Sequence, residues 1–128
     1  MRTRFAVALA MLAGAGVGAA VTQTLHAQAK PPVYVVTEIA VRNIPGYVNE
    51  YAPRAQASIK KAGGKILAAS LNVTQLEGPA PKRVVIQVWD SPEQIAAWAH
   101  GSDYDEIRKI GEKYAIFRSF AVEGLPPE

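Results

Sequence analysis

The 128-residue sequence contains no cysteine, and this absence excludes several kinds of protein. Without thiols the chain has no disulfide, no thiolate metal site and no cysteine nucleophile. Histidine is almost as scarce, with only His26 and His100. The sequence also lacks a Ser-His-Asp signature, a phosphate-binding loop and a dinucleotide fingerprint. Because no cluster of histidines and carboxylates has the spacing of metal ligands, we predict neither a metal site nor a cofactor.

A strongly apolar run long enough to span a membrane is missing too. Residues 5–21 are uncharged but rich in alanine and glycine, whereas a spanning helix needs about 20 strongly apolar residues. Arg2 and Arg4 precede this run, and the AQA sequence at 27–29 follows it as a small-x-small cleavage pattern. We therefore expect residues 1–29 to be a cleaved secretory signal peptide, which makes the mature protein periplasmic or secreted. An uncleaved membrane anchor is the alternative.

The mature chain has no large excess of charge of one sign. The full sequence has 14 Lys and Arg against 11 Asp and Glu, and two of the cations, Arg2 and Arg4, lie in the expected signal. Residues 30–128 are therefore nearly neutral, which argues against nucleic acid as a partner and against membrane binding after cleavage. This length suits a single domain with a modest core, for which a second subunit would add stability.

Strand-like and helix-like segments alternate along residues 30–128. The expected strands are residues 33–41, 65–76, 83–89 and 116–123, which are rich in β-branched side chains. A helical spacing of apolar residues covers 46–62, where Pro53 predicts that the main helix begins near it, after a separate first turn or a kinked lead at 44–51. Gly63 ends this helix. Ser91 is the expected N-cap of a second helical region, which Gly101 divides in two.

The order strand-helix-strand-strand-helix-strand predicts an α+β fold. We expect a ferredoxin-like βαββαβ sandwich, in which two helices cover one face of a four-stranded antiparallel sheet. We assign to the helix-covered face Val33, Val35, Ile39, Val84, Ile86 and Val88. We assign to the opposite face Tyr34, Val36, Glu38, Ala40, Arg83, Val85, Gln87, Trp89, Phe117, Ser119, Ala121 and Glu123. This second set is too apolar to face water alone, so we predict a homodimer that covers it.

Short motifs occur along the mature chain in a specific order. They are YVVTEIAV at 34–41, Gly63-Gly64, Leu76-Glu77-Gly78, Lys82-Arg83-Val84-Val85, Ser91-Pro92, Ala97-Trp98, Tyr104 and Val122-Glu123-Gly124-Leu125. Over about residues 33–125 the chain resembles the domain-of-unknown-function family 1330, in the dimeric α/β-barrel, ferredoxin-like group. The resemblance implies the fold and a dimeric α/β barrel, and it implies no reaction. Relatives often carry arginine at the position of Gly111, and here Arg108 lies one helical turn earlier.

Aromatic side chains with polar tips provide the main candidate binding site. Aromatic residues on helices that face a sheet usually belong to the core, but several together can line a cleft for a flat or apolar molecule. Charged side chains near the same layer could bind a polar group of that molecule. The candidate ligand-binding residues are Tyr51, Glu77, Arg83, Trp89, Trp98, Tyr104 and Arg108.

Four charged or titratable residues allow more than one interpretation. Glu77 and Arg83 flank a proline-rich turn, and we favour an ion pair that braces it over the binding of a polar ligand group. Glu38 is expected to lie near Arg83 or Gln87, where a paired structural acid is favoured over a functional one. For His100, at a helix end, we favour a surface position over general-base catalysis.

Three functions remain open at this point. The favoured one is a dimer that binds a small apolar or aromatic molecule between its helices and its sheet. The second is a cofactor-independent oxygenase or isomerase, which would need a titratable group in the cleft. The third is a purely structural or partner-binding module, without a cavity.

Overall fold

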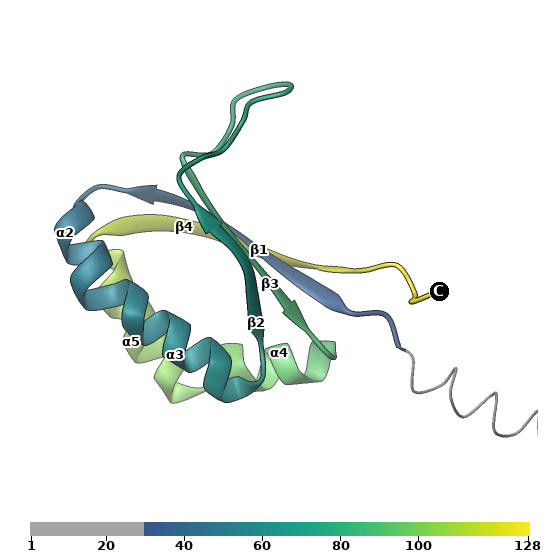
Figure 1. The fold of residues 1–128 in the computed structure, drawn as a ribbon. Coiled ribbons are helices and arrows are strands. Elements are labelled where there is room, and N and C mark those ends of the chain that lie inside the picture. Colours follow the sequence, from purple (N-terminus) through teal and green to yellow (C-terminus); the bar gives the residue numbers. More distant parts are fainter. Residues whose placement is uncertain (1–29) are drawn as a thin grey trace, which may run out of the picture. The chain divides into compact units, whose positions relative to one another are not determined.

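Four antiparallel strands form one open sheet in the order β2-β3-β1-β4. The strands are β1 (Val33–Val41), β2 (Lys65–Ser70), β3 (Arg83–Trp89) and β4 (Ala115–Glu123). The computed structural model describes residues 30–128, so the expected signal peptide at 1–29 lies outside the described residues. Figure 1 shows the helices together on one face of the sheet. This confirms the predicted α+β, ferredoxin-like architecture.

The first helical region has three parts, which are α2 (Ile44–Gly46), the π-helix η2 (Tyr47–Tyr51) and α3 (Ala52–Ala62). Asn43 begins it, since its side-chain oxygen accepts a hydrogen bond from the Gly46 amide at 3.0 Å. Pro53 lies in the first turn of α3, directly after the π-helix, so its missing N–H falls where the helical hydrogen-bond pattern changes. Gly63 ends α3 with a φ of 101°, a conformation that favours glycine. The main helix α3 thus begins next to Pro53 as predicted, although helical segments follow one another without a gap from Ile44 to Ala62.

The second helical region consists of α4 (Pro92–Ala99) and α5 (Ser102–Glu112). Ser91 begins α4 as predicted, because its hydroxyl accepts a hydrogen bond from the Gln94 amide at 3.1 Å. The Gln94 side chain accepts in turn from the Asp90 amide at 3.0 Å. Among the described residues, no helix is long and apolar enough to cross a membrane.

The expected faces of β3 and β4 are wrong by one residue. In the antiparallel register, Val35 lies opposite Gln87 and Ile39 lies opposite Arg83, and directly opposed residues share a face. Because Val35 and Ile39 are buried beneath the helices, Arg83, Val85, Gln87 and Trp89 face the helices as well. The register of β4 likewise places Phe117 and Ser119 on this covered face. A shift of one residue exchanges the two faces of a strand.

The opposite face, here called the outer face, is therefore more apolar than the sequence suggested. By register it carries Tyr34, Val36, Glu38, Ala40, Val84, Ile86, Val88, Ile116, Arg118, Phe120 and Val122. Three of its large hydrophobic residues, Ile116, Phe120 and Val122, are exposed. Its one ion pair joins Arg118 Nη1 to Glu38 Oε1 at 3.1 Å.

Strand β2 ends at Ser70, six residues earlier than expected. The Ser70 hydroxyl accepts a hydrogen bond from the Asn72 amide at 2.8 Å, and the Val73 amide donates to the Leu71 carbonyl at 3.0 Å. Such local hydrogen bonds form a turn that competes with the sheet ladder. The long β2–β3 hairpin therefore extends beyond the sheet (Figure 1).

Two core clusters lie between the helices and the sheet. One is centred on Trp89, which is 1% exposed, and includes Val35 and Ile59. The other contains Ile39, Tyr47, Tyr51 and Ala115. A cavity lies between these two clusters.

Candidate functional site

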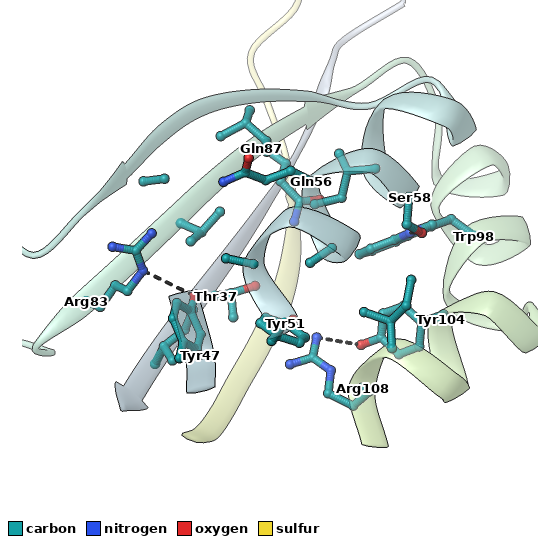
Figure 2. A pocket seen from close by; sticks show the side chains of 18 residues that line it. Thr37, Tyr47, Tyr51, Gln56, Ser58, Arg83, Gln87, Trp98, Tyr104 and Arg108 are labelled. Carbon is teal, nitrogen blue, oxygen red and sulfur yellow. Dashed lines mark hydrogen bonds between the residues drawn. The ribbon is translucent and has the colours of Figure 1, made fainter. Parts of the chain in front are cut away.

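The helices and the covered face of the sheet enclose a cavity of about 50 Å³ (Figure 2). Strands β1, β2 and β3 supply its floor, and η2, α3, α4 and α5 supply its roof and walls. Its polar lining residues are Thr37, Tyr47, Tyr51, Gln56, Ser58, Arg83, Gln87, Trp98, Tyr104 and Arg108. A water molecule requires roughly 10–15 Å³ on this scale. The cavity thus has room for a few waters or for one small chemical group.

A wider groove of about 420 Å³ adjoins this cavity. The two spaces share five lining residues, Ile39, Tyr47, Ala52, Gln56 and Arg83. The groove is mostly apolar, and three of its side chains, Ile44, Val48 and Leu71, are more than half exposed to solvent. Pockets for small organic molecules typically occupy about 300–1,000 Å³. The groove therefore has the size for the body of a ligand.

Arg83 and Tyr47 lie where the groove meets the cavity. Arg83 Nε donates a hydrogen bond to the Tyr47 hydroxyl at 3.2 Å, and the guanidinium carbon lies 5.4 Å from the centre of the Tyr47 ring. This contact fixes one side of the guanidinium fork, while its two terminal nitrogens point away from Tyr47 (Figure 2). No described carboxylate forms an ion pair with Arg83.

Arg108 is the second guanidinium on the cavity wall. Its carbon lies 4.0 Å from the ring centre of Phe117, 5.1 Å from that of Tyr104 and 6.0 Å from that of Tyr51. Nη2 donates to the Tyr104 hydroxyl at 3.0 Å, whereas the buried Nη1 has no hydrogen-bond partner among the described residues. The aromatic faces attract the cation, but a buried charged donor without an acceptor remains costly.

The lining residues include no aspartate, glutamate, histidine or lysine. Both of the charged groups in the cavity wall, Arg83 and Arg108, are positive, and Lys82 adds a third cation in the groove. Residues 30–128 as a whole have nearly equal numbers of positive and negative side chains. The positive character is therefore local to this site.

Tyr51 remains a neutral hydrogen-bonding group at physiological pH. Burial raises the pKa of its phenol to about 12, although the nearby positive charge of Arg108 acts in the opposite direction. The ring stacks at 5.3 Å from that of Tyr47 and at 5.1 Å from that of Phe117. Tyr51 therefore supplies an uncharged polar tip to the cavity and does not act as a base there.

Two tryptophans fix the far end of the cavity. Trp89 Nε1 donates to Gln87 Oε1 at 2.8 Å, which fixes the amide that lines the cavity. Trp98 Nε1 donates to the Ser58 hydroxyl at 3.0 Å. The two indole rings lie 5.0 Å apart, and Tyr104 meets Trp98 edge-on at 4.8 Å. The polar lining at this end is thus held by hydrogen bonds within the protein.

The structure brings together five of the seven predicted ligand-binding residues. Tyr51, Arg83, Trp98, Tyr104 and Arg108 all line the cavity, and their role in binding stays a prediction. Trp89 lies outside the lining as a core residue behind Gln87. Glu77 is exposed in the β2–β3 hairpin, also outside the lining.

Three expectations about the charged residues are wrong. Glu77 and Arg83 do not form an ion pair within the described chain, because Arg83 turns beneath the helices to Tyr47. Glu38 lies on the outer face with Arg118 rather than near Arg83, since the expected faces were shifted by one residue. For the same reason Arg83 is not on the side that we expected to form the dimer.

The remaining sequence expectations concern histidine and metal ligands. His100 is exposed at the C-terminal end of α4, where a surface position was favoured. In residues 30–128 no group of histidines and carboxylates is arranged to hold a metal ion.

The sequence interpretation missed several lining residues, among them Tyr47 and Gln87. Tyr47 lies four residues before Tyr51, so both rings point to the same side of the first helical region. Gln87 alternates with Val85 and Trp89 on β3. The size of Trp89 was an available signal, because such a large side chain favours the covered face.

Gly111 explains how α5 approaches Tyr51 so closely. A Cβ at this position would lie 2.6 Å from the Tyr51 ring and 2.9 Å from Phe117. An arginine side chain at this position would therefore collide with both rings. Arg108 instead presents its guanidinium to the cavity from one turn earlier on α5.

A four-stranded ferredoxin-like sheet with a cavity beneath its helices defines a class of small α+β proteins. Within this class, the chain belongs to the family described as a domain of unknown function, DUF1330, whose model matches residues 32–125. This match confirms the resemblance that the sequence motifs indicated. No curated protein matches the sequence.

Several solved structures are similar to this chain at low sequence identity. A protein of unknown function from Rhodopseudomonas palustris has a TM-score of 0.63 and 17% identity, covering 77% of this chain and 85% of that one. SnoaB, a cofactor-independent oxygenase from Streptomyces nogalater, has a TM-score of 0.56 and 12% identity, covering 76% and 96%. A dimeric, ferredoxin-like protein of unknown function from Bacteroides fragilis has a TM-score of 0.50 and 12% identity, covering 72% and 95%. Similarity at these identities establishes the fold alone.

Proposed function

We propose that this protein binds a small apolar or aromatic molecule between its helices and its sheet. The observation that carries the proposal is the cavity itself, which opens into an apolar groove and is lined by aromatic rings with polar tips. A ligand that covers solvent-exposed apolar side chains such as Ile44, Val48 and Leu71 removes apolar surface from water, which favours binding. A purely structural module would have no need of this space.

The direct test is to fill the cavity and ask whether binding is lost. Ala52 lines both the cavity and the adjoining groove on α3, whereas Ala57 is exposed on the same helix and lies outside both linings. A set of flat aromatic molecules is screened by thermal shift against the purified protein. Hits should lose their effect in Ala52→Leu and keep it in Ala57→Leu. A set without hits, or hits that both variants retain, would contradict the proposal.

We further propose that the protein is exported and acts as a homodimer through the outer face. The sequence of residues 1–29 supports export, because it combines two arginines, an apolar run and a small-x-small site. Exposed apolar residues on the outer face support a covering partner. The neighbour from Bacteroides fragilis, of the same fold, is described as dimeric.

The homodimer is tested by light scattering during gel filtration at micromolar concentration. Ile86 lies at the centre of the outer face, between Val36 on β1 and Ala68 on β2. The unmodified protein should have twice the chain mass, and Ile86→Lys should have the mass of one chain. As a control, Leu76→Lys in the exposed hairpin should stay dimeric. A single-chain mass for the unmodified protein would contradict the dimer.

A cofactor-independent enzyme is the second candidate function. The fold likeness to SnoaB supports it, as does Arg108, whose positive charge beside a bound molecule would stabilise a negative charge developing there. The lining contains no carboxylate or imidazole to remove a proton, so binding is the preferred function. Incubating each hit with the protein in air and recording its mass and its NMR spectrum tests catalysis by an oxygenase or an isomerase. An unchanged mass and an unchanged spectrum for every hit would count against the enzyme.

A further inference from the structure

We infer, on the basis of the proposed binding function, that the ligand is an organic acid: an apolar or aromatic body that bears a carboxylate. The carboxylate enters the cavity beside Arg83 and Arg108, and the body lies in the groove. The inference combines the charge of the lining, the free donors of the two arginines and the sizes of the two spaces.

Two guanidinium groups line one small space in which no side chain carries a negative charge. Lys82 adds a further cation at the groove. Like charges enclosed together repel one another, and an isolated charge loses hydration when it is buried. A bound anion offsets both costs, whereas a neutral ligand offsets neither.

Both arginines have hydrogen-bond donors without acceptors among the described residues. Arg83 uses Nε on Tyr47 and directs its terminal nitrogens away from that contact (Figure 2). Arg108 donates from Nη2 to Tyr104, and its Nη1 is covered by protein atoms and has no partner. A carboxylate is an acceptor whose geometry matches the guanidinium fork. The terminal nitrogens of Arg83 are thus the donors that an anion reaches first.

The cavity and the groove differ in the size of the group that each can hold. An aromatic ring does not fit the cavity, because its volume is about 50 Å³ and a protein cavity that binds benzene has about 150 Å³. A carboxylate needs far less space than a ring. The adjoining groove, at about 420 Å³, accommodates a ring, and its walls include Val41, Ile44 and Val48. The head group is therefore the acid, and the body is apolar.

The test compares acids with their neutral amides, which have nearly the same shape. Dissociation constants are measured by calorimetry for benzoate, 2-naphthoate and 4-phenylbutyrate and for the corresponding amides. At least one acid should bind about tenfold or more tightly than its amide, as expected for a hydrogen bond to a charged group. Equal affinities would overturn the organic-acid inference but leave the binding function intact. Failure of every acid and amide to bind would overturn both.

Substitutions then show whether the two arginines provide this preference. Arg83→Met and Arg108→Met keep much of the side-chain volume but remove the charge, so each should lower acid affinity about tenfold or more and leave amide affinity unchanged. Arg83→Lys should retain part of the preference, because it keeps the charge. Arg54→Met is the control, since Arg54 is exposed on α3 outside both spaces. If Arg108→Met fails to fold, the inference is tested with the Arg83 variants alone. An unchanged preference for acids over amides in Arg83→Met would then contradict it.

Discussion

The two ends of the layer between helices and sheet are built from similar aromatic residues but differ in how completely their polar groups are satisfied. At the tryptophan end, Trp89 is almost fully buried and both indole N–H groups are hydrogen-bonded, to Gln87 and to Ser58. At the tyrosine end, the packing leaves a cavity, and Arg108 Nη1 lacks a partner. The tryptophan end, here called the closed end, is organised for stability. The tyrosine end, here called the open end, keeps a cavity and a hydrogen-bond donor without a partner.

The largest effect is expected at the closed end. Trp89→Ala removes the most deeply buried large side chain and leaves the Gln87 carbonyl without its donor. We expect the free energy of unfolding to fall by about 3–5 kcal/mol. Urea denaturation measures this change, and Leu76→Ala in the exposed hairpin is the control. A loss below about 1 kcal/mol would mean that this end does not carry the stability.

A smaller but still clear effect is expected from Gly64→Ala. The added Cβ would lie 2.6 Å from the Trp89 ring and 2.9 Å from Ile59. We expect this overpacking to cost about 1–3 kcal/mol in denaturation experiments. In Gly101→Ala the nearest atoms lie at 3.4 Å and belong to backbone carbonyls, so the loss should be smaller. Equal losses in the two variants would argue against close packing around Trp89.

The open end should show a pH dependence from Tyr51. The pKa of this phenol is about 12 in the folded protein, against 10.0 for an ordinary tyrosine. Between these values the unfolded chain releases the proton first, so stability is constant below pH 10 and falls as the pH rises through 12. Relative to Tyr51→Phe, the unmodified protein should lose about 1 kcal/mol by pH 11. Parallel pH profiles of the two proteins would contradict the buried, neutral phenol.

The smallest change in stability is expected for Arg108→Met. Arg108 is half-buried and its Nη1 lacks an acceptor, and replacing such a cation by an apolar side chain of similar volume is often neutral or stabilising. We expect the free energy of unfolding to stay within about 0.5 kcal/mol or to rise. A loss of several kcal/mol would show that Arg108 is a structural residue like Trp89, and the contrast between the two ends would disappear.

The sequence predicted the element order, the start of the main helix near Pro53 and the cap at Ser91, because these features depend on local chemistry. It did not predict which face of β3 meets the helices. One face of the segment RVVIQVW is wholly apolar, with Val84, Ile86 and Val88, whereas the other carries Arg83 and Gln87, so alternation alone favours the wrong face. The choice depends on the register with β1, which places Trp89 opposite Val33.

The same limit applies to the candidate site. The side chains of Tyr51, Trp98, Tyr104 and Arg108 project from helices, and their positions follow from helical spacing. Glu77 was misplaced because six residues across a turn suggested a contact with Arg83. Whether a hairpin closes such a pair depends on where β2 ends, and the local turn at Ser70 determines that.

The most direct test of the account is a side-chain NMR titration of the ¹⁵N-labelled protein with 2-naphthoate, observing the Nε–H signals of the arginines. The account predicts that the signals of Arg83 and Arg108 move together and saturate, while those of Arg42, Arg54 and Arg118 stay in place. 2-Naphthamide should move the Arg83 and Arg108 signals less at equal concentration. Changes confined to the arginines outside the cavity would contradict a binding site beneath the helices.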